Sequence, residues 1–375
     1  MPYNGCVAPP DQSSLETLRR LMRHSANLDI LRSLAVSMVL IDHLVRTLVV
    51  HSGLRNIAVI AFTSHIGHVG VLAFFVHTSL VLMYSLERMA RSEDRVSLRF
   101  YVRRFFRIYP LSIFCIIVAV IFHVPANPLG GTRGFALPVV IANLLLVQNI
   151  ITKTSVLGPL WSLPFEVQMY VVLPALYYLT LRRRAIAYLI GLLALFCVFG
   201  CLLFHATGHL SMAAYVPCFL SGVLCYSLRD HIRTSVSSAL WPPFVLLLIC
   251  GYCVTNMADD AKFWVGWIFC LSLGLAINFF HDSASKPINA VARRVALYSY
   301  GIYLTQVLVL YLVFVVFGVN NLVFGPLLSL VLIIAASVVT YHLIESPFMK
   351  LGKRLSIRSV RTSVLVPVEE TREGS

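Results

Sequence analysis

Charged residues are scarce in this chain of 375 residues. Only 12% of the residues are charged and 16 residues are acidic, whereas 58% are hydrophobic and the mean hydropathy is +0.83. A water-soluble fold could not bury so large an apolar share. The shortage of charge therefore excludes a large soluble domain and indicates a chain that is surrounded mostly by lipid.

Other familiar signals are missing as well. The N-terminal stretch has no signal-peptide pattern of a basic start, a short apolar core and a small-residue cleavage site, so we expect the first span to insert uncleaved. No internal repeat of fixed period is evident. His65, His68 and His77 lie near one another, but no cysteine or carboxylate spacing completes a zinc site with them, so we expect no metal.

The basic residues that are present give a formal net charge of +14. Such a balance can indicate phosphate binding and hence a nucleic-acid partner. Here, however, the lysines and arginines cluster in short loops between apolar runs, which is the pattern that fixes membrane orientation and favours anionic headgroups. We therefore expect membrane lipid as a partner, and not nucleic acid.

The apolar runs predict an all-α polytopic transmembrane bundle of about ten spans, since a span needs roughly 20 apolar residues. An eleventh stretch, residues 136–151, is short and is flanked by proline, glycine and polar residues. Ten spans put every basic cluster on one side, whereas an eleventh crossing would divide the clusters between both sides. We therefore expect 136–151 to be a re-entrant or interfacial segment. The ten candidate spans are residues 29–50, 66–86, 108–124, 161–180, 185–205, 210–228, 240–256, 262–280, 297–317 and 322–344.

This topology predicts three parts of the chain. Residues 1–27 form a cytoplasmic N-terminal segment, residues 28–346 the membrane domain, and residues 347–375 a basic and then polar cytoplasmic tail. Within the first part, residues 13–24 suit either a helix at the membrane surface or a disordered tail. Glu345, just before Pro347, predicts a helix end.

The first span carries five polar residues in an otherwise apolar stretch: Asp29, Arg32, Asp42, His43 and Arg46. Each costs several kcal/mol in mid-membrane unless it is paired or solvated. Arg32 and His43 are three helical turns apart, so they point the same way at about 16 Å separation and can line one cavity at two depths. Alternatively, Arg32 reaches the headgroups and His43 makes an ordinary interhelical hydrogen bond.

Two further motifs bring charge to the membrane. In RFYVRRFFRIYP, Arg104 and Arg107 lie at i and i+3 on one helical face, where guanidiniums can grip phosphate; orientation alone would also explain them. GPLWSLPFEVQMYVVLPAL enters its span from the outer side, with Trp161 at the interface and Glu166 one turn beyond. Glu166 needs a polar cavity, His43 or an arginine as a partner, or else serves as a structural ion pair.

Taken together, these landmarks resemble the acyltransferase 3 family of bacterial integral-membrane acyltransferases. The resemblance covers nearly the whole chain. It implies a multi-pass protein of the bacterial inner membrane with both termini in the cytoplasm. It also implies transfer of an acyl group, most often acetyl, from cytoplasmic acyl-CoA to a hydroxyl of an extracytoplasmic glycan such as exopolysaccharide, lipopolysaccharide or a secreted oligosaccharide. The stretches that carry the resemblance are LDILRSLAVSMVLIDHL, GHVGVLAFFVHTS, FYVRRFFRIYPL, GPLWSLPFEVQMYVVLPAL, and SYGIYLTQ with HLIESPFMKLGKRL.

The resemblance also implies roles for single residues. His43 matches the catalytic histidine and Glu166 the acidic residue of the outer motif, while Arg32, Arg104 and Arg107 match groups that engage the acyl donor. Acyl-CoA, most often acetyl-CoA, is then a co-substrate, and no permanently bound cofactor is implied. Asp42, Trp161 and Gln306 are candidates for contacting the acceptor or orienting the catalytic groups.

The chain departs from the family pattern at several polar positions. Leu72 stands where an acidic residue is common, Thr78 and Ser79 replace a Ser-Gly pair, and Gln306 replaces a histidine. These changes concern groups that could touch the acceptor, so they leave its identity open.

The leading hypothesis is a tunnel in which His43 removes the acceptor's proton, oriented by Asp42 or Glu166. Direct transfer and an acyl-enzyme route both fit the sequence. The alternative is a transporter or flippase of a polar envelope metabolite, since buried charges also line substrate paths. A noncatalytic scaffold ranks last because it gains nothing from intramembrane charge.

Overall fold

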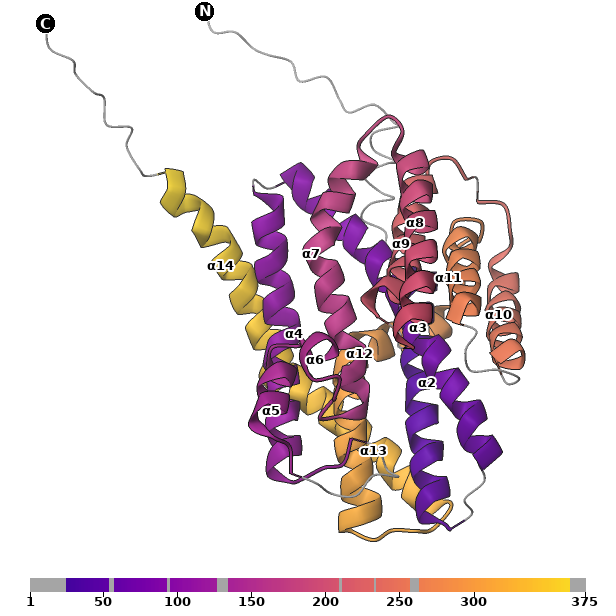
Figure 1. Ribbon diagram of the computed structural model, residues 1–375, viewed down its shortest axis with the longest axis vertical. Coiled ribbons are helices and arrows are strands. Elements are labelled where there is room, and N and C mark those ends of the chain that lie inside the picture. The colour runs from indigo at the N-terminus through magenta and orange to yellow at the C-terminus, as the bar shows by residue number, and fades with distance from the viewer. Residues whose placement is uncertain are drawn as a thin grey trace, which may run out of the picture.

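The computed structural model describes residues 25–53, 57–92, 95–126, 134–208, 211–232, 234–256 and 263–364. The stretch 13–24, with its two predicted states, and the polar end 365–375 lie outside the described residues. The elements in chain order (Figure 1) are α2 (Ala26–His51), α3 (Ile57–Ser92), α4 (Val96–Ile121), α5 (Leu137–Leu144), α6 (Gln148–Ile151), η1 (Gly158–Trp161), α7 (Leu163–Thr180), α8 (Ala185–Thr207), α9 (Met212–Leu228), η2 (Ser238–Leu240), α10 (Trp241–Asn256), α11 (Phe263–Ile277), α12 (Lys286–Tyr311), η3 (Leu312–Val316), α13 (Phe324–Thr340), η4 (Tyr341–Glu345) and α14 (Ser346–Val364).

The helices of the described residues form a membrane bundle. Seven stretches are long and apolar enough to cross a membrane by length and composition, and α9 and α11 are shorter apolar helices. α7 adds 18 residues. The predicted all-α polytopic bundle is therefore confirmed, whereas the count of ten spans stays a prediction.

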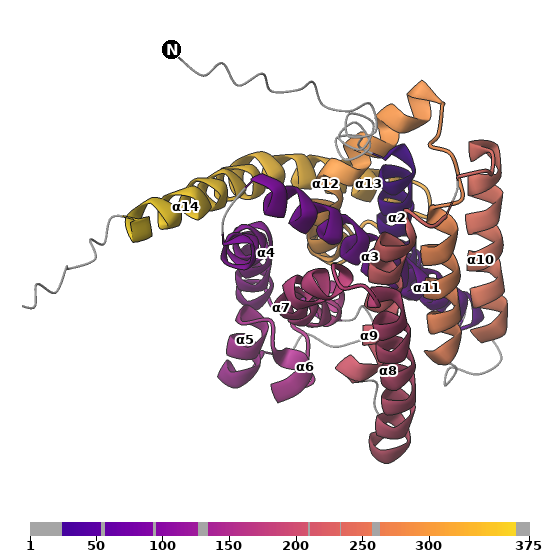
Figure 2. The same cartoon turned by 90° about the horizontal axis from the view of Figure 1, so that it is seen from above.

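The bundle is built around α3. Within the most apolar part of each helix, 72% of α3 is buried inside the protein but only 11% of α8. Figure 2 shows α3 near the middle of the bundle and α8 at its rim. On α8 the large apolar side chains Leu195, Val198 and Leu202 are exposed, as expected for a helix whose outer face meets lipid.

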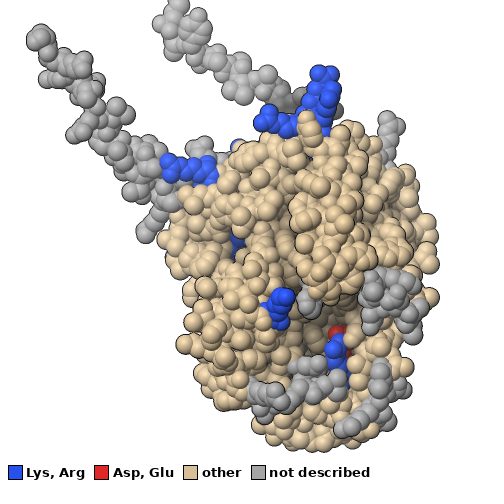
Figure 3. All heavy atoms as spheres, in the orientation of Figure 1, with Lys and Arg blue, Asp and Glu red and all other residues tan. Residues whose placement is uncertain are grey.

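Basic side chains gather at one end of the molecule. In Figure 3 they are densest at the top, near the turn between α7 and α8 and near α14, while the rest of this face is largely uncharged. Arg182, Arg183 and Arg184 form that turn and are exposed. We call this end the basic end. α2 and α12 start beside each other, since Ser25 and Asn27 bond to Asp282 in the loop that precedes α12.

The segment from α5 to η1 folds into the bundle without crossing it. α5 has eight residues, about 12 Å of helix, which is too short for a hydrocarbon core about 30 Å thick. Two of its side-chain amides bond within the segment: Asn143 Nδ2 donates to the Thr154 carbonyl at 2.8 Å, and Gln148 Nε2 donates to the Leu160 carbonyl at 2.9 Å. This arrangement fits the predicted re-entrant or interfacial segment.

The helix end predicted at Pro347 is wrong. The chain passes from α13 through the π-helical turn η4 directly into α14, with Pro347 as the second residue of α14. α14 packs along α4: a Cβ at Gly352 would lie 2.7 Å from Phe106 Cβ. The tail predicted for residues 347–375 therefore begins as a packed helix.

Candidate active site

A small cavity of about 70 Å³ lies inside the bundle, and we call it the arginine cavity. It brings together four residues that the sequence analysis singled out from three separate motifs. Five helices contribute to its wall: α2, α3, α4, α7 and α12. The lining residues are Arg32, His77, Thr78, Val81, Leu82, Arg104, Arg107, Ile108, Glu166, Tyr170 and Tyr300.

The two α4 arginines have different partners. Arg107 Nη1 donates to Glu345 Oε2 at 2.6 Å, and its guanidinium lies over the Tyr300 ring at 5.5 Å. Among the described residues Arg104 makes no ion pair; it lies over the Phe100 ring at 5.9 Å, and its Nε is buried without a hydrogen-bond partner. The i,i+3 spacing puts both at one cavity, but only Arg107 is already neutralised.

Arg32 reaches the same cavity from α2. Its Nε donates to Ser299 Oγ of α12 at 2.7 Å, and Ser299 Oγ in turn donates to the Ala296 carbonyl at 2.8 Å. The side chain is thus fixed inside the bundle and lines the cavity, rather than extending to the headgroups.

Glu166 lies in the first turn of α7, where Tyr170 OH donates to its Oε1 at 2.6 Å. The sequence analysis put this carboxylate on the outer side, whereas the structure brings it to the same cavity as Arg32 and Arg104. The reason is the preceding segment: Leu157 and Leu160 are fully buried, so the chain has already entered the bundle when α7 begins. The predicted polar cavity for Glu166 is present.

His43 lies outside the arginine cavity. It shares a face of α2 with Arg32, as predicted, but a Cβ at Gly158 would lie only 3.7 Å from its Nε2, and the Gln306 side chain lies within interaction range. Its Nδ1 is buried and has no hydrogen-bond partner among the described residues. The one cavity predicted for Arg32 and His43 is therefore two neighbouring environments along one helix.

Asp42 does not orient His43 by a hydrogen bond, contrary to one of our expectations. Arg46 Nη2 donates to both of its carboxylate oxygens, at 2.9 and 3.1 Å, and to Ser64 Oγ at 2.6 Å. Consecutive residues on a helix point about 100° apart, so the carboxylate of Asp42 faces α3 while the imidazole of His43 faces η1 and α12.

Trp161 is part of an aromatic cluster, and its predicted position at the membrane interface stays a prediction. Its ring centroid lies 5.7 Å from those of His68 and Tyr215, and 6.2 Å from that of Phe165. These partners belong to α3, α9 and α7, so the tryptophan fixes the end of η1 inside the bundle.

The turn η1 is also tied to α12 by hydrogen bonds. Tyr303 OH lies 2.7 Å from Ser162 Oγ and donates to the Pro159 carbonyl at 2.8 Å. Gln306 Nε2 donates to the Tyr303 carbonyl at 3.0 Å, and its buried Oε1 has no hydrogen-bond partner among the described residues. Through these contacts α12 holds both neighbours of His43, namely Gly158 and Gln306.

Only some of the departures from the family pattern lie near the site. Leu72 is buried opposite Gly266, where a Cβ would lie 2.9 Å from Leu72 Cδ1, and Ser79 Oγ faces Gly222 at the α3–α9 crossing. Both serve helix packing through small residues. Thr78, in contrast, lines the arginine cavity.

Residues 25–342 match the family described as an acyltransferase domain. The chain belongs to the acyltransferase 3 family. A curated relative, acyltransferase MdmB of Streptomyces mycarofaciens, is 32% identical over 124 residues, which cover 32% of this chain and 30% of that relative. No solved structure matches the chain.

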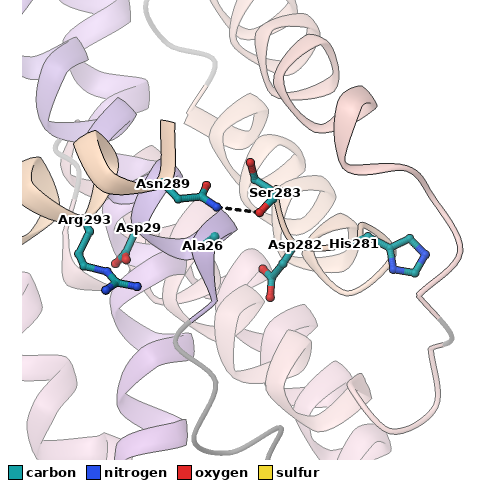
Figure 4. Close-up of a pocket in the computed structure, with 7 residues that line it drawn as sticks. All are labelled: Ala26, Asp29, His281, Asp282, Ser283, Asn289 and Arg293. Atoms are coloured by element: carbon teal, nitrogen blue, oxygen red, sulfur yellow. Dashed lines mark hydrogen bonds between the residues drawn. The ribbon is translucent and has the colours of Figure 1, made fainter. Parts of the chain in front are cut away.

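This acyltransferase 3 chain has a second, larger pocket where α2 and α12 start, with a volume of about 450 Å³ (Figure 4). Asp29, Asp282 and Arg293 line it, and Asn289 Nδ2 donates to the Ser283 carbonyl at 2.7 Å. With two carboxylates and one guanidinium, it suits a phosphate less well than the arginine cavity does. It gives Asp29, one turn before Arg32, a polar environment.

Sequence reasoning did not assign a role in this acyltransferase 3 site to three residues: Tyr170, Tyr300 and Glu345. Tyr170 lies four residues after Glu166, so the helical spacing alone could have indicated their contact. Tyr300 and Glu345 lie in SYGIYLTQ and HLIESPF, which were noted only as landmarks. Nothing local in the sequence indicates that they meet Arg107.

Proposed function

We propose that the chain transfers an acyl group from acyl-CoA on the cytoplasmic side to a hydroxyl of an extracytoplasmic glycan. The observation that carries this proposal is the convergence of Arg32, Arg104 and Glu166 on one cavity, with the imidazole of His43 further along the same helix. Membership of an acyltransferase family supports the reaction class. Acetyl as the acyl group and a glycan as the acceptor follow from the resemblance described above.

The arginine cavity is the donor end of this proposal. Guanidiniums bind phosphate by paired, charge-assisted hydrogen bonds, and coenzyme A carries several phosphate groups. Arg104 and Arg32 make no ion pair among the described residues, so their charge is available to such a ligand. At about 70 Å³ the cavity is smaller than a coenzyme, so we expect it to widen when the donor enters.

His43 is the base of the proposed reaction. Its imidazole would take the proton of the acceptor hydroxyl as that oxygen forms a bond with the thioester carbonyl carbon. The bond from carbon to sulfur breaks, and the coenzyme leaves as a thiol after the sulfur takes up a proton. We favour this direct route because it needs one base and no covalent intermediate on the protein.

Orientation follows from the basic residues at the start of α12, namely Lys286, Arg293 and Arg294. Basic segments are retained on the cytoplasmic side of a membrane, which would put the neighbouring starts of α2 and α12 there and His43 nearer the outer side. A donor could then arrive from the cytoplasm and an acceptor from outside.

Purified full-length protein in lipid nanodiscs tests the proposal. With radiolabelled acetyl-CoA and a glycan extract, we expect label in the glycan and one free thiol for each acetyl group transferred. Mass spectrometry of envelope glycans from cells with and without the protein would identify the acceptor by the added acetyl groups. Gradient-driven solute uptake into proteoliposomes, without thiol release, would instead support the transporter alternative.

A further inference from the structure

Glu345 is a buried carboxylate that the reaction proposed above does not use. It ends the π-helical turn η4, and its side chain is 0% exposed. Its Oε2 accepts the 2.6 Å bond from Arg107, while its Oε1 is buried with no hydrogen-bond partner among the described residues. π-helical turns within longer helices occur frequently at functional sites.

The helix that follows Glu345 packs along the same part of α4. Met349 Sδ lies 3.2 Å from Arg107 Nη1, and Arg103 Nε donates to Ser356 Oγ at 3.2 Å. Between these two contacts, Gly352 allows the close approach to Phe106. The position of Arg107 is therefore set by one continuous helical unit, from η4 into α14, and not by α4 alone.

The two arginines of the i,i+3 pair differ in charge balance as a result. Arg107 has a carboxylate partner and an aromatic ring beneath it, whereas Arg104 has no ion-pair partner among the described residues. An incoming phosphate would have to compete with Glu345 for Arg107. Arg104 and Arg32 share the cavity with Glu166 but form no ion pair with it among the described residues, so neither has to be released from a salt bridge.

We propose that Glu345 is a positioning residue for the donor site, which holds Arg107 against Tyr300 so that Arg104 and Arg32 make the direct contacts with the acyl-donor phosphates. This inference rests on the proposed function. It assigns the two family-motif arginines unequal tasks: one supports the wall of the arginine cavity, and the other binds the ligand.

Stability alone is a poor explanation for the pair. A buried ion pair contributes little net stability, because the cost of removing two charges from water offsets their attraction. The chain offers a matched control in Glu87, which is 5% exposed and accepts hydrogen bonds from Arg91 at 2.9 Å and from Arg229 at 3.1 Å. Glu87 does not line the arginine cavity.

The test compares Glu345→Ala, Glu345→Gln and Glu87→Ala in the full-length protein in nanodiscs. Steady-state transfer rates are measured first with acetyl-CoA varied at a saturating concentration of acceptor. They are then measured with the acceptor varied at saturating acetyl-CoA. We expect Glu345→Ala to raise the KM for acetyl-CoA about tenfold while kcat and the acceptor KM change less than about threefold. Glu345→Gln keeps one neutral acceptor for Arg107, so it should raise the donor KM only about threefold.

Glu87→Ala should leave the donor KM unchanged even where it lowers the unfolding temperature. The proposal is overturned if Glu345→Ala and Glu87→Ala have the same KM for acetyl-CoA. It is also overturned if Glu345→Ala lowers kcat and leaves the KM for acetyl-CoA unchanged. Should Glu345→Ala not fold, the Glu345→Gln variant decides the question alone, and an unchanged donor KM overturns the proposal. Absence of acetyl-CoA-dependent transfer in the unsubstituted protein would refute the proposed function instead, so the two failures are distinguishable.

Discussion

The two polar environments along α2 differ in how they are built. Around Arg32, charged groups from α2, α4, α7 and η4 converge, with two carboxylates beside three guanidiniums. Near His43 the charges of Asp42 and Arg46 are paired with each other, and the imidazole itself lies against Gly158 and the neutral amide of Gln306. The first environment suits binding of a charged ligand, and the second suits an imidazole that must stay neutral until it accepts a proton.

The comparison separates tasks that a single chamber would have combined. Binding of an anionic donor needs permanent positive charge, whereas proton removal needs an imidazole whose protonated form is not stabilised by unpaired carboxylates nearby. The distance of about 16 Å along α2 keeps the two requirements apart. The following substitutions test this separation, from the largest expected effect to the smallest.

Replacing the imidazole should have the largest effect. We expect His43→Ala to lower kcat by about 10²–10⁴-fold, the usual contribution of a general base, while binding of acetyl-CoA is retained. Transfer kinetics and equilibrium binding of the donor, measured on the same nanodisc sample, check both parts. Full transfer activity in a normally folded His43→Ala protein would contradict the proposed base.

Removing the free guanidinium should affect the donor instead. We expect Arg104→Ala to raise the KM for acetyl-CoA about 10- to 100-fold, because a charge-assisted contact worth roughly 1.5–3 kcal/mol is lost. Arg183→Ala, at the exposed turn between α7 and α8, is the matched control for one lost positive charge. Equal KM values for acetyl-CoA in the two variants would contradict the proposed contact between Arg104 and the donor.

Crowding the imidazole should have a moderate effect. A Cβ at Gly158 would lie 3.0 Å from the Ala126 carbonyl oxygen and 3.7 Å from His43 Nε2. We expect Gly158→Ala to lower kcat by about 3- to 10-fold with an unchanged donor KM, since the tight contact with Ala126 shifts η1 and with it the new methyl group beside the imidazole. Gly191→Ala on α8 is the control, because nothing lies within 4 Å of its added Cβ.

Asp42 should matter least for transfer. Because its carboxylate is bonded to Arg46, we expect Asp42→Asn to change kcat less than about twofold. The same substitution should lower the free energy of unfolding by about 1–3 kcal/mol, as the partly buried guanidinium of Arg46 loses its charged partner. Thermal unfolding in detergent and transfer kinetics measure the two effects. If Asp42→Asn lowers kcat as much as His43→Ala does, Asp42 orients the catalytic imidazole after all.

The sequence predicted where helices lie along the chain better than how deeply single residues lie in the bundle. Hydropathy located the spans because each is a long apolar run, but α4 begins at Val96 rather than near residue 108, since its basic first turns are helical as well. The depth of Glu166 depends on how residues 137–161 fold into the bundle. No local pattern encodes that.

The candidate site was predictable where contacts follow helical spacing. Arg32 and His43 share a face of α2, and Arg104 and Arg107 share one of α4, as their numbering requires. The contact of Arg107 with Glu345 spans 238 positions of sequence, and that of Arg32 with Ser299 spans 267. Such pairs depend on the order in which helices pack, which one sequence read alone does not reveal.

The π-helical turn η4 sets how α14 is rotated about the helix axis relative to α13. Its i,i+5 bonding accommodates one residue more than an α-helical path would, so the faces of α13 and α14 are offset along an otherwise continuous rod. Deleting a single residue from Tyr341–Glu345 would turn α14 by about 100° and move Gly352 away from Phe106. Any homologue without the extra residue must therefore align with a one-position gap inside an apparently unbroken C-terminal helix.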